Sequence, residues 1–254
     1  MKIDVVKIGG KILEDASALQ LFLEEFKRVD GLKILVHGGG RSATAIAKKL
    51  EVETEMIDGR RATNRAMLDV VTMVYGGLVN KTIVSKLQAI GVNALGLTGA
   101  DGGLILSHKR SPNPVDYGYV GDVDRVDSNA FLKLAKGGMV PVVAPLTHDG
   151  KGRLLNTNAD TIAQEIAAAL SNQATVRLIY CFEFDGVLRD PSNEESVISL
   201  INQKSFIKYQ EEGVLTGGMV PKIKNALDAV KRGVSQVLIT SYKDLLGKKG
   251  TTIE

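Results

Sequence analysis

The fold is decided by a pattern near the start of the chain, Val5-Val6-Lys7-Ile8-Gly9-Gly10-Lys11: a short apolar strand that runs into glycines and then into a helical pattern. The same pattern recurs at Ile34-Leu35-Val36-His37-Gly38-Gly39-Gly40. Glycines let backbone N–H groups approach an anion closely, and a following helix adds the partial positive charge of its N-terminus. The two stretches therefore predict two anion-binding loops, which is typical of a protein that transfers a group between two ligands.

Helical and extended patterns alternate along the rest of the chain. Helical stripes, with apolar residues at i, i+3, i+4 and i+7, begin at Leu19, Ala43 and Met67. Short apolar runs bounded by Gly or Pro, at residues 92–97 and 139–144, predict buried strands between the helices. This order predicts an α/β fold with an open, mainly parallel sheet and helices on both faces, and it places ligands at the carboxyl ends of the strands.

A domain boundary is predicted at Ser171-Asn172-Gln173, a polar interruption after the Ala-rich helical pattern of residues 161–170. It divides an N-terminal lobe, 1–172, from a C-terminal lobe, 173–254, although one continuous sheet that crosses the boundary fits the pattern equally well. After the boundary we expect a strand at 175–180, a loop, two helices and a final strand around 234–239.

The composition is that of an ordinary globular protein, with 44% hydrophobic and 24% charged residues among 254. The net charge of +3 is spread along the chain, and no basic block or aromatic-interleaved stripe indicates a nucleic-acid partner. A single cysteine, Cys181, fits a reducing cytoplasm, and we expect it in the core. Asp4 and the following glycines interrupt any signal-peptide core, and no apolar run approaches the roughly 20 residues that span a bilayer.

Two common nucleotide signatures were tested against the chain. A Walker A loop is absent, because Asn80-Lys81-Thr82 lacks the glycine before its lysine. The dinucleotide pattern is matched weakly by Gly38, Gly40 and Ala43, with Asp58 at a suitable distance. A dinucleotide-dependent oxidoreductase therefore stays an alternative on these residues alone, beside a tight turn that only packs a helix on a strand.

Three later segments favour a different class. Residues 155–160, Leu-Asn-Thr-Asn-Ala-Asp, open a helix with more polar side chains than an N-cap requires. Residues 215–222, Leu-Thr-Gly-Gly-Met-Val-Pro-Lys, form a third glycine loop that leads into a helix carrying Lys222. Residues 58–63 place two arginines in a turn, and an arginine fork suits a carboxylate as well as it suits solvent.

Together these segments resemble the amino-acid kinase family, and within it the N-acetyl-L-glutamate kinases. The resemblance covers nearly the whole chain in the family's order, and the ordered set is far more specific than any member. Its further members are Asn80-Lys81, Gly96 to Gly102, Tyr119 to Val123 and Gly250 to Ile253. It implies a three-layer αβα sandwich with an acyl-amino-acid lobe and an ATP lobe, and ATP-dependent phosphorylation of the substrate's γ-carboxylate, a step of arginine biosynthesis.

The resemblance also implies a role for each matching residue. Lys7 and Lys222 would contact the phosphoryl group in flight, and Asp160 would hold these lysines. The substrate would be bound by Gly39, Gly40, Arg61, Asn156 and Asn158. The nucleotide would be bound by Gly9 and Gly10 at its phosphates, and by residues 183–188 and 214–219 at its base and ribose, with Glu183, Asp185, Gly186, Leu215, Thr216 and Gly218 as contacts.

The chemistry explains why these residue types suffice. A γ-carboxylate with a pKa near 4.3 is already ionised at neutral pH, so the nucleophile needs no general base. Lysines, glycine amides and Mg²⁺ arriving with ATP would offset the repulsion between carboxylate and phosphates. We therefore expect no metal ligand from the protein and no catalytic histidine: His37 would line a loop, and His108 and His148 would be surface or turn residues.

Departures from the family pattern concern both ligands. Residues 181–186, Cys-Phe-Glu-Phe-Asp-Gly, replace an aspartate followed by small or apolar residues, which affects nucleotide contacts. Arg60 replaces an apolar neighbour of Arg61, and Arg65 follows one helical turn later. This extra positive charge suggests N-succinyl-L-glutamate as an alternative acceptor.

The assembly is expected to be a homodimer. Arginine-inhibited family members carry an extra N-terminal helix that helps to form hexamers, and the first strand here starts at once, so we expect weak inhibition by arginine. The apolar helix from Met67 to Leu87 is a candidate dimer face, and a buried core helix is an equally good interpretation.

Competing functions account for fewer segments. An oxidoreductase leaves residues 156–160 and 216–222 without a role, and a nucleotide sensor would not need both lysines and Asp160. Within the family, kinases of carbamate, aspartate, uridylate or carrier-linked aminoadipate are nearer rivals, and residues 59–63 and 156–160 favour an acylglutamate.

Overall fold

The computed structural model describes residues 1–57, 59–190, 192–216, 219–246 and 249–254. It forms two compact units: unit 1 comprises Met1–Lys33 with Ala163–Glu254, and unit 2 comprises Ile34–Ile162. These units differ from the lobes expected at 1–172 and 173–254, because the first strand pairs with residues 175–180 of the chain. The division into functional lobes stays a prediction. Asp58 and Gly218, both named above, lie outside the described residues.

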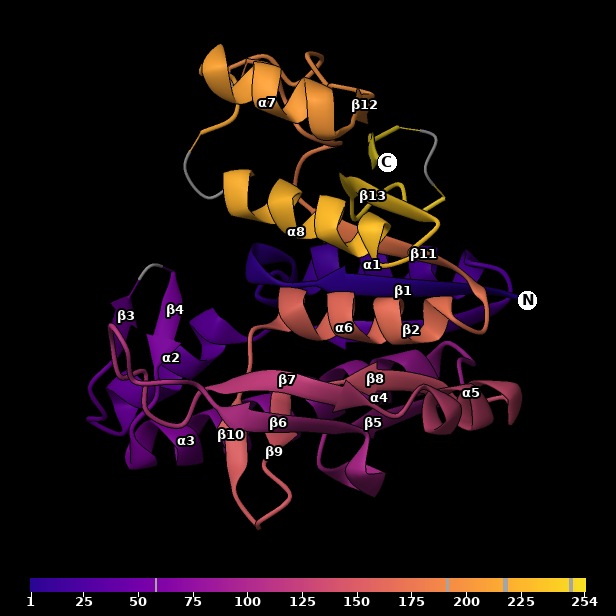
Figure 1. Ribbon diagram of the computed structural model, residues 1–254. Helices are drawn as coiled ribbons and strands as arrows, with labels where there is room; N and C mark the ends of the chain where they lie inside the picture. Colours follow the sequence, from indigo (N-terminus) through magenta and orange to yellow (C-terminus); the bar gives the residue numbers. More distant parts are fainter. Residues whose placement is uncertain (58, 191, 217–218, 247–248) are drawn as a thin grey trace. The chain divides into compact units, whose positions relative to one another are not determined.

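Unit 1 is built on a mainly parallel sheet with the strand order β12-β14-β13-β11-β1 (Figure 1). Strand β1 pairs in parallel with β11, and β11 with β13, whereas β13 and β14 are antiparallel. The strands are β1 (Lys2–Ile8), β11 (Thr175–Phe182), β12 (Leu200–Ile201), β13 (Gln236–Ser241) and β14 (Thr251–Ile253). The strand expected around 234–239 is present as β13, but it is not the final strand. Thr251–Ile253 form β14, which pairs with β13.

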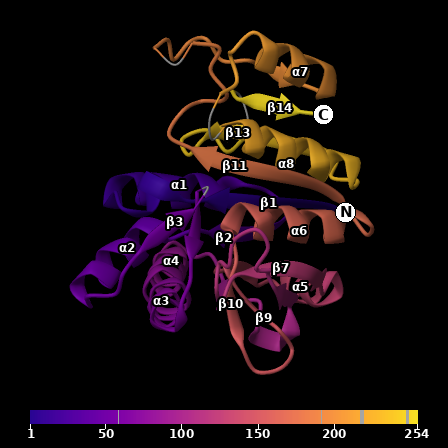
Figure 2. The same ribbon diagram turned by 60° about the vertical axis from the view of Figure 1, so that its left-hand side comes forward.

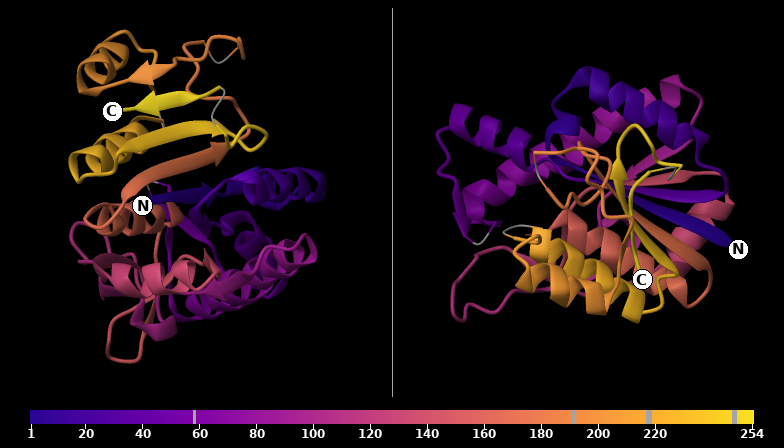
Figure 3. Two further views of the ribbon diagram at one scale, coloured as in Figure 1. Left: turned by 90° about the vertical axis from the view of Figure 1, so that its right-hand side faces the viewer. Right: turned by 90° about the horizontal axis from the view of Figure 1, so that it is seen from above.

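Helices cover both faces of this sheet, with α1 on one side and α8 on the other (Figure 3, right). They are η1 (Gly10–Leu13), α1 (Ala16–Arg28), α7 (Gln203–Glu211), α8 (Met219–Lys231) and most of α6 (Ala159–Ser171), which begins in unit 2. Helix α1 buries Leu19, Phe22, Leu23 and Phe26, as its periodicity predicts, and Asp15 caps it by accepting from two backbone N–H groups. Its apolar stripe thus fixes which face meets the strands.

A buried ion pair joins the two central strands of unit 1. Asp4 on β1 is 2% exposed and stands opposite Arg177 on β11, which donates to both of its carboxylate oxygens at 2.7 and 3.1 Å. Bidentate pairing compensates a buried carboxylate for its lost hydration. Cys181, further along β11, is buried as predicted, and burial raises the pKa of its thiol.

Unit 2 holds a parallel set β2-β8-β5, a four-stranded sheet β10-β9-β6-β7 and the hairpin β3-β4. The strands are β2 (Leu32–His37), β3 (Glu55–Ile57), β4 (Arg60–Ala62), β5 (Ala94–Leu97), β6 (Ile105–Lys109), β7 (Gly121–Val126), β8 (Val140–Val143), β9 (Leu146–His148) and β10 (Leu154–Asn156). The helices are α2 (Gly40–Lys49), α3 (Arg65–Val71), η2 (Thr72–Val79), α4 (Asn80–Ala89), η3 (Asp101–Gly103) and α5 (Ser128–Lys136). The fold class predicted from the sequence is confirmed.

The elements α3, η2 and α4 form one continuous helix, Arg65–Ala89, and Figure 2 shows α2 beside it. Its central segment η2 is a π-helix, in which the Asn80 N–H reaches back to the carbonyl of Tyr75. By length and composition alone this helix could cross a membrane, the single such case among the described residues, but half of its most apolar window is buried in the protein. Core helices of globular proteins meet the same criterion, so the helix is weak evidence for a membrane span.

Candidate functional site

Lys7 lies at the carboxyl end of β1, where the first glycine loop begins. Its side chain is 8% exposed. A methyl group added to Gly9 would lie 2.9 Å from Lys7 Nζ, so the missing side chain makes room for the ammonium group. Gly10 has φ +58°, a left-handed conformation that glycine adopts without strain. The loop thus brings a buried cation beside a bare backbone, which fits the predicted phosphate site.

The two predicted catalytic lysines converge on one aromatic ring within unit 1. Lys222 Nζ lies 4.1 Å from the ring centroid of Phe182, and Lys7 Nζ lies 5.9 Å from it. Lys222 comes from the first turn of α8, and Phe182 ends β11. The structure therefore brings together residues that are 215 positions apart in the chain, through a phenylalanine that sequence reasoning did not select. Its only signal was the departure from the family pattern at residues 181–186.

The loop after β11 carries the predicted base and ribose contacts. Gly186 packs against β14, since a methyl group there would meet Thr251 Oγ1 at 2.7 Å, and the Thr251 hydroxyl accepts from Val187 N–H at 2.8 Å. Asp185 faces Lys249, with 3.6 Å between Oδ2 and Nζ. The glycine thus allows the loop to pack closely on β14, and its predicted contact with the nucleotide stays a prediction.

This loop borders an open cavity of about 590 Å³ within unit 1. Carboxylates outnumber cations in its lining, which disfavours a triphosphate there but not a neutral base and ribose. Leu215 is buried and Thr216 is exposed, and neither lines the cavity. The lining residues are Glu25, Arg28, Glu183, Phe184, Asp185, Glu194, Ser241, Lys243, Asp244, Leu246 and Lys249.

The second glycine loop opens helix α2 in unit 2. Gly39 has φ +151°, and a methyl group there would lie 2.9 Å from the ring of Tyr75. Both the conformation and the space require glycine at this position. Gly40 begins the helix, so the amides of this loop point where the helix N-terminus is positive, which suits an acceptor carboxylate.

Arg61, for which substrate binding is predicted, lies against this loop. It is 7% exposed, and its Nη2 donates to the carbonyl of Gly40 and to the hydroxyl of Thr44, each at 2.8 Å. Tyr75 also faces Arg61: burial raises the pKa of the Tyr75 hydroxyl, and the Arg61 charge opposes this rise. A guanidinium and a helix N-terminus therefore meet at one place.

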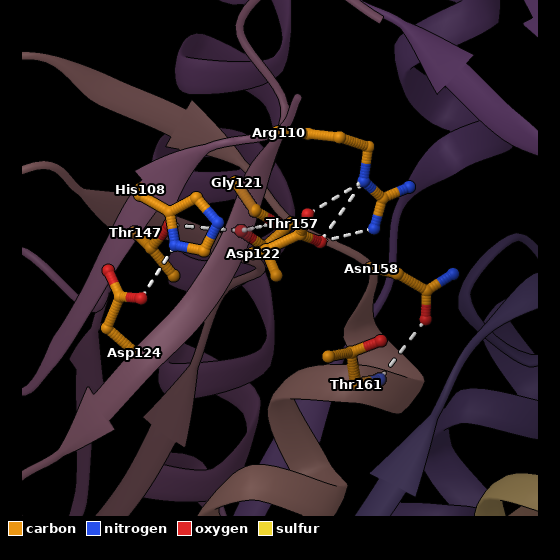
Figure 4. A network of polar contacts seen from close by, with 9 residues as sticks. All are labelled: His108, Arg110, Gly121, Asp122, Asp124, Thr147, Thr157, Asn158 and Thr161. Atoms are coloured by element: carbon orange, nitrogen blue, oxygen red, sulfur yellow. Dashed lines mark hydrogen bonds and ion pairs between the residues drawn. The ribbon is translucent and has the colours of Figure 1, made fainter. Parts of the chain in front are cut away.

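Asn156 and Asn158 have different positions. Asn156 is 8% exposed, and its amide donates to Thr63 Oγ1 at 3.0 Å, which ties β10 to the segment that carries Arg61. Asn158 is exposed and caps α6, since its Oδ1 accepts from the N–H groups of Asp160 and Thr161 (Figure 4). The simple N-cap interpretation therefore accounts for Asn158. Asp160 lies half-buried in the first turn of α6.

His37 does not line a loop, so that expectation is wrong. Its imidazole is fully buried at the end of β2, where the apolar run before it continues into the core. Nδ1 donates to the Gly38 carbonyl at 2.7 Å, and Nε2 accepts from Asn80 Nδ2 at 3.0 Å. Asn80 also donates to the carbonyl of Val142. Burial, together with the charge of Lys81, lowers the pKa of His37 to about 4, so the ring is neutral.

Arg60 points away from Arg61, because neighbouring strand residues alternate between faces. Burial and the charge of Arg110 lower the pKa of Arg60, whereas Asp122 and Tyr117 oppose this change. Arg110 forks onto Asp122, donating from Nε to both oxygens at 3.0 and 3.1 Å (Figure 4), and so holds the pKa of Asp122 down. Two guanidinium groups therefore share one carboxylate.

The other two histidines lie close to their expected places. His108 is exposed on β6 and faces Asp124, with 2.6 Å between Nδ1 and Oδ1 (Figure 4). His148 ends β9 and is half-buried, and its Nδ1 accepts from the Gly150 N–H.

The chain is similar to known proteins in sequence and in fold. Residues 2–241 match the family described as the amino acid kinase family. An acetylglutamate kinase from Bacteroides fragilis is 56% identical over 253 residues, covering 100% of this chain and 97% of the relative. One from Methanopyrus kandleri is 40% identical, covering 98% and 99%. The crystal structure of smu.665 from Streptococcus mutans UA159 has a TM-score of 0.83 at 30% identity, covering 99% and 98%. The chain belongs to the amino acid kinase family.

Proposed function

We propose that the protein transfers the γ-phosphoryl group of ATP to the γ-carboxylate of N-acetyl-L-glutamate, a step of arginine biosynthesis. The observation that carries this proposal is the contact of Arg61 with Gly40 at the N-terminus of α2. A guanidinium group and a helix N-terminus both favour binding of a carboxylate. The names of the relatives supply the particular acceptor. The product is an acyl phosphate.

Each residue group has one task in this proposal. Arg61 and Asn156 hold the α-carboxylate end of the acceptor, and the amides of the Gly39–Gly40 loop hold the reacting carboxylate. Because that carboxylate is ionised at neutral pH, no side chain has to remove a proton. Lys7 and Lys222 stabilise the negative charge that develops on the transferring group, and Asp160 orients the lysine ammonium groups.

ATP would be held at two places in unit 1. The Gly9–Gly10 loop beside Lys7 suits its phosphates, and the acidic cavity bordered by Glu183 and Asp185 suits its base and ribose. Among the described residues no group of three or more His, Cys, Asp or Glu side chains could hold a metal ion. We propose that Mg²⁺ arrives with ATP and is held by the phosphates and water, where it would neutralise phosphate charge.

The test is an ATP-dependent hydroxamate assay, because hydroxylamine traps an acyl phosphate. The acceptors are N-acetyl-L-glutamate, N-succinyl-L-glutamate, L-aspartate and carbamate, with uridylate followed by ADP release. We expect hydroxamate from an N-acyl-L-glutamate and none from L-aspartate. Tight NAD binding without ATP binding would support the oxidoreductase alternative and overturn the proposal.

A second candidate acceptor is N-succinyl-L-glutamate. It is favoured by the excess positive charge of Arg60 and Arg110 over their shared Asp122, which a second ligand carboxylate would balance. The measurement is kcat/KM for the acetyl and succinyl compounds in the native enzyme and in Arg60→Gln. A succinyl preference that Arg60→Gln abolishes supports this acceptor, and a preference for the acetyl compound rules it out.

We further propose a homodimer that works in the cytoplasm. The long helix Arg65–Ala89 exposes two large apolar side chains, Met73 and Leu78, each by more than half. A second copy of this helix would cover them, which suits the candidate dimer face. Light scattering after chromatography measures the mass, and a Met73→Glu, Leu78→Glu variant should be monomeric if this face forms the dimer.

A further inference from the structure

Phe182 lies near both candidate catalytic lysines, Lys7 and Lys222, and has no role in the reaction described so far. Lys222 Nζ is 4.1 Å from its ring centroid and Lys7 Nζ is 5.9 Å away, both within the range of a cation–π interaction. The ring and Lys222 are half-buried, and Lys7 is almost fully buried. Interactions of this kind strengthen when water is excluded, so burial matters here.

Strand register explains why the ring faces both lysines. Lys7 on β1 stands opposite Tyr180 on β11, and Phe182 follows Tyr180 by two residues. Because side chains alternate along a strand, Lys7 and Phe182 lie on the same face of the sheet. Helix α8 packs on β13 and β14 and brings Lys222 to the ring. A buried thiol, Cys181, lies on the opposite face.

An aromatic ring holds a lysine differently from a carboxylate. A carboxylate would orient the ammonium groups but would also repel an incoming nucleotide phosphate. The ring face attracts cations through its quadrupole and carries no net charge. It can therefore help to hold two like-charged groups close together without adding a negative charge that would repel a phosphoryl group.

We propose that Phe182 is a positioning residue, whose ring face holds the Lys7 and Lys222 ammonium groups in the place where they meet the transferring phosphoryl group. This inference rests on the proposed phosphoryl transfer. It predicts that the strength of the cation–π interaction, and not the bulk of the side chain, sets the turnover of the enzyme.

Graded fluorination of this ring tests the proposal. Phe182 is replaced by 4-fluoro-, 3,5-difluoro- and 3,4,5-trifluorophenylalanine, which keep the ring's shape while weakening its attraction for cations. We expect log kcat to fall in step with the number of fluorines, reaching a loss of about twofold to thirtyfold, with an unchanged KM for the acceptor. Phe182→Leu should lose a similar factor, and Phe182→Trp should retain activity.

The matched control is Phe26 in α1 of unit 1, whose fully buried ring lies 5.2 Å from Lys33 Nζ and to which the proposed reaction gives no role. The same fluorinated series at Phe26 should leave kcat unchanged. A kcat that does not vary with fluorination at position 182 overturns the proposal, as does an equal decline in the Phe26 series.

A second readout does not depend on activity. In protein labelled with ¹³C-lysine, the ε-methylene resonance of Lys222 should be shifted upfield by the ring and should lose this shift in Phe182→Leu. An unshifted resonance in the native protein contradicts the geometry. An enzyme that gives no hydroxamate but shows the shift refutes the proposed function and leaves the contact standing.

Discussion

Acidification should destabilise the protein through one buried side chain, His37. In the unfolded chain its imidazole takes up a proton as the pH falls through its ordinary value of 6.5, whereas the folded ring stays neutral down to about 4. A proton on Nε2 would point at Asn80 Nδ2, which is itself a donor. The Asn80 Oδ1 already accepts from Lys81 Nζ at 3.1 Å, so turning the amide to accept the new proton would break that bond. The stabilising contribution of His37 is therefore complete above pH 6.5 and is lost as the pH falls toward 4.

The two pKa values set the size of this effect. Between pH 7 and pH 5 the free energy of unfolding should fall by about 2 kcal/mol, and the whole contribution is about 3 kcal/mol. Such a loss is a large part of the stability of an ordinary domain. It arises from His37 because the ring cannot be protonated without breaking the bond from Asn80.

The assay is urea unfolding from pH 7.5 to 4.5 for the native protein, for His37→Gln and for His108→Gln as the matched control. His37→Gln should lower the free energy of unfolding at every pH. It should also remove the fall of about 2 kcal/mol in this free energy between pH 7 and pH 5. His108 is exposed, so its replacement should leave that fall in place. A proton NMR titration of the native histidines is decisive without any variant: a His37 ring that titrates near 6.5 refutes the reasoning.

Three further predictions concern the reaction and the second glycine loop. Lys7→Ala or Lys222→Ala should lower kcat by on the order of 10² or more, since each removes a preorganised donor to the transferring group, and near-normal turnover in both variants would refute their assignment. Arg61→Ala should raise the KM for the acyl-amino acid much more than the KM for ATP in steady-state assays, and an unchanged acceptor KM would exclude a carboxylate clamp. Gly39→Ala should destabilise the protein by about 1–3 kcal/mol in urea unfolding, because φ +151° and the nearby Tyr75 ring exclude a side chain. Gly40→Ala is the control and should be tolerated, because its new methyl group would lie 3.9 Å from Arg61.

The sequence predicted those features that local patterns encode. Apolar periodicity placed α1 correctly, because the stripe from Leu19 to Phe26 has one face to bury. The glycine runs were correctly placed after strands, since a bare backbone at a strand end is a local property. The contact between Arg61 and Gly40 was not predicted, because the two residues are 21 positions apart and only the fold brings them together.

Features that depend on tertiary packing could not be predicted. His37 looked like a loop residue because it precedes three glycines, and only the distant Asn80 and Val142 make its burial favourable. Phe182 looked like a departure within a nucleotide loop, and its meeting with Lys222 depends on how α8 packs. Leu215 and Thr216, for which nucleotide contacts are predicted, do not line the acidic cavity. The position of their side chains could not be predicted, because no sequence pattern shows where a loop points.

The π-helical winding of Thr72–Val79 affects the second glycine loop through two side chains of the continuous helix, Tyr75 and Asn80. Tyr75 fills the space beside Gly39 of that loop, and Asn80 donates to His37, which ends the strand before the loop. A five-residue step overshoots one turn by about 140° in an α-helix, and the wider winding of a π-helix reduces this offset. Winding Thr72–Val79 as an α-helix without removing a residue would therefore rotate one of the two side chains out of its contact. A substitution that favours α-helical winding of this segment should therefore impair acceptor binding, although it alters no residue of the glycine loop.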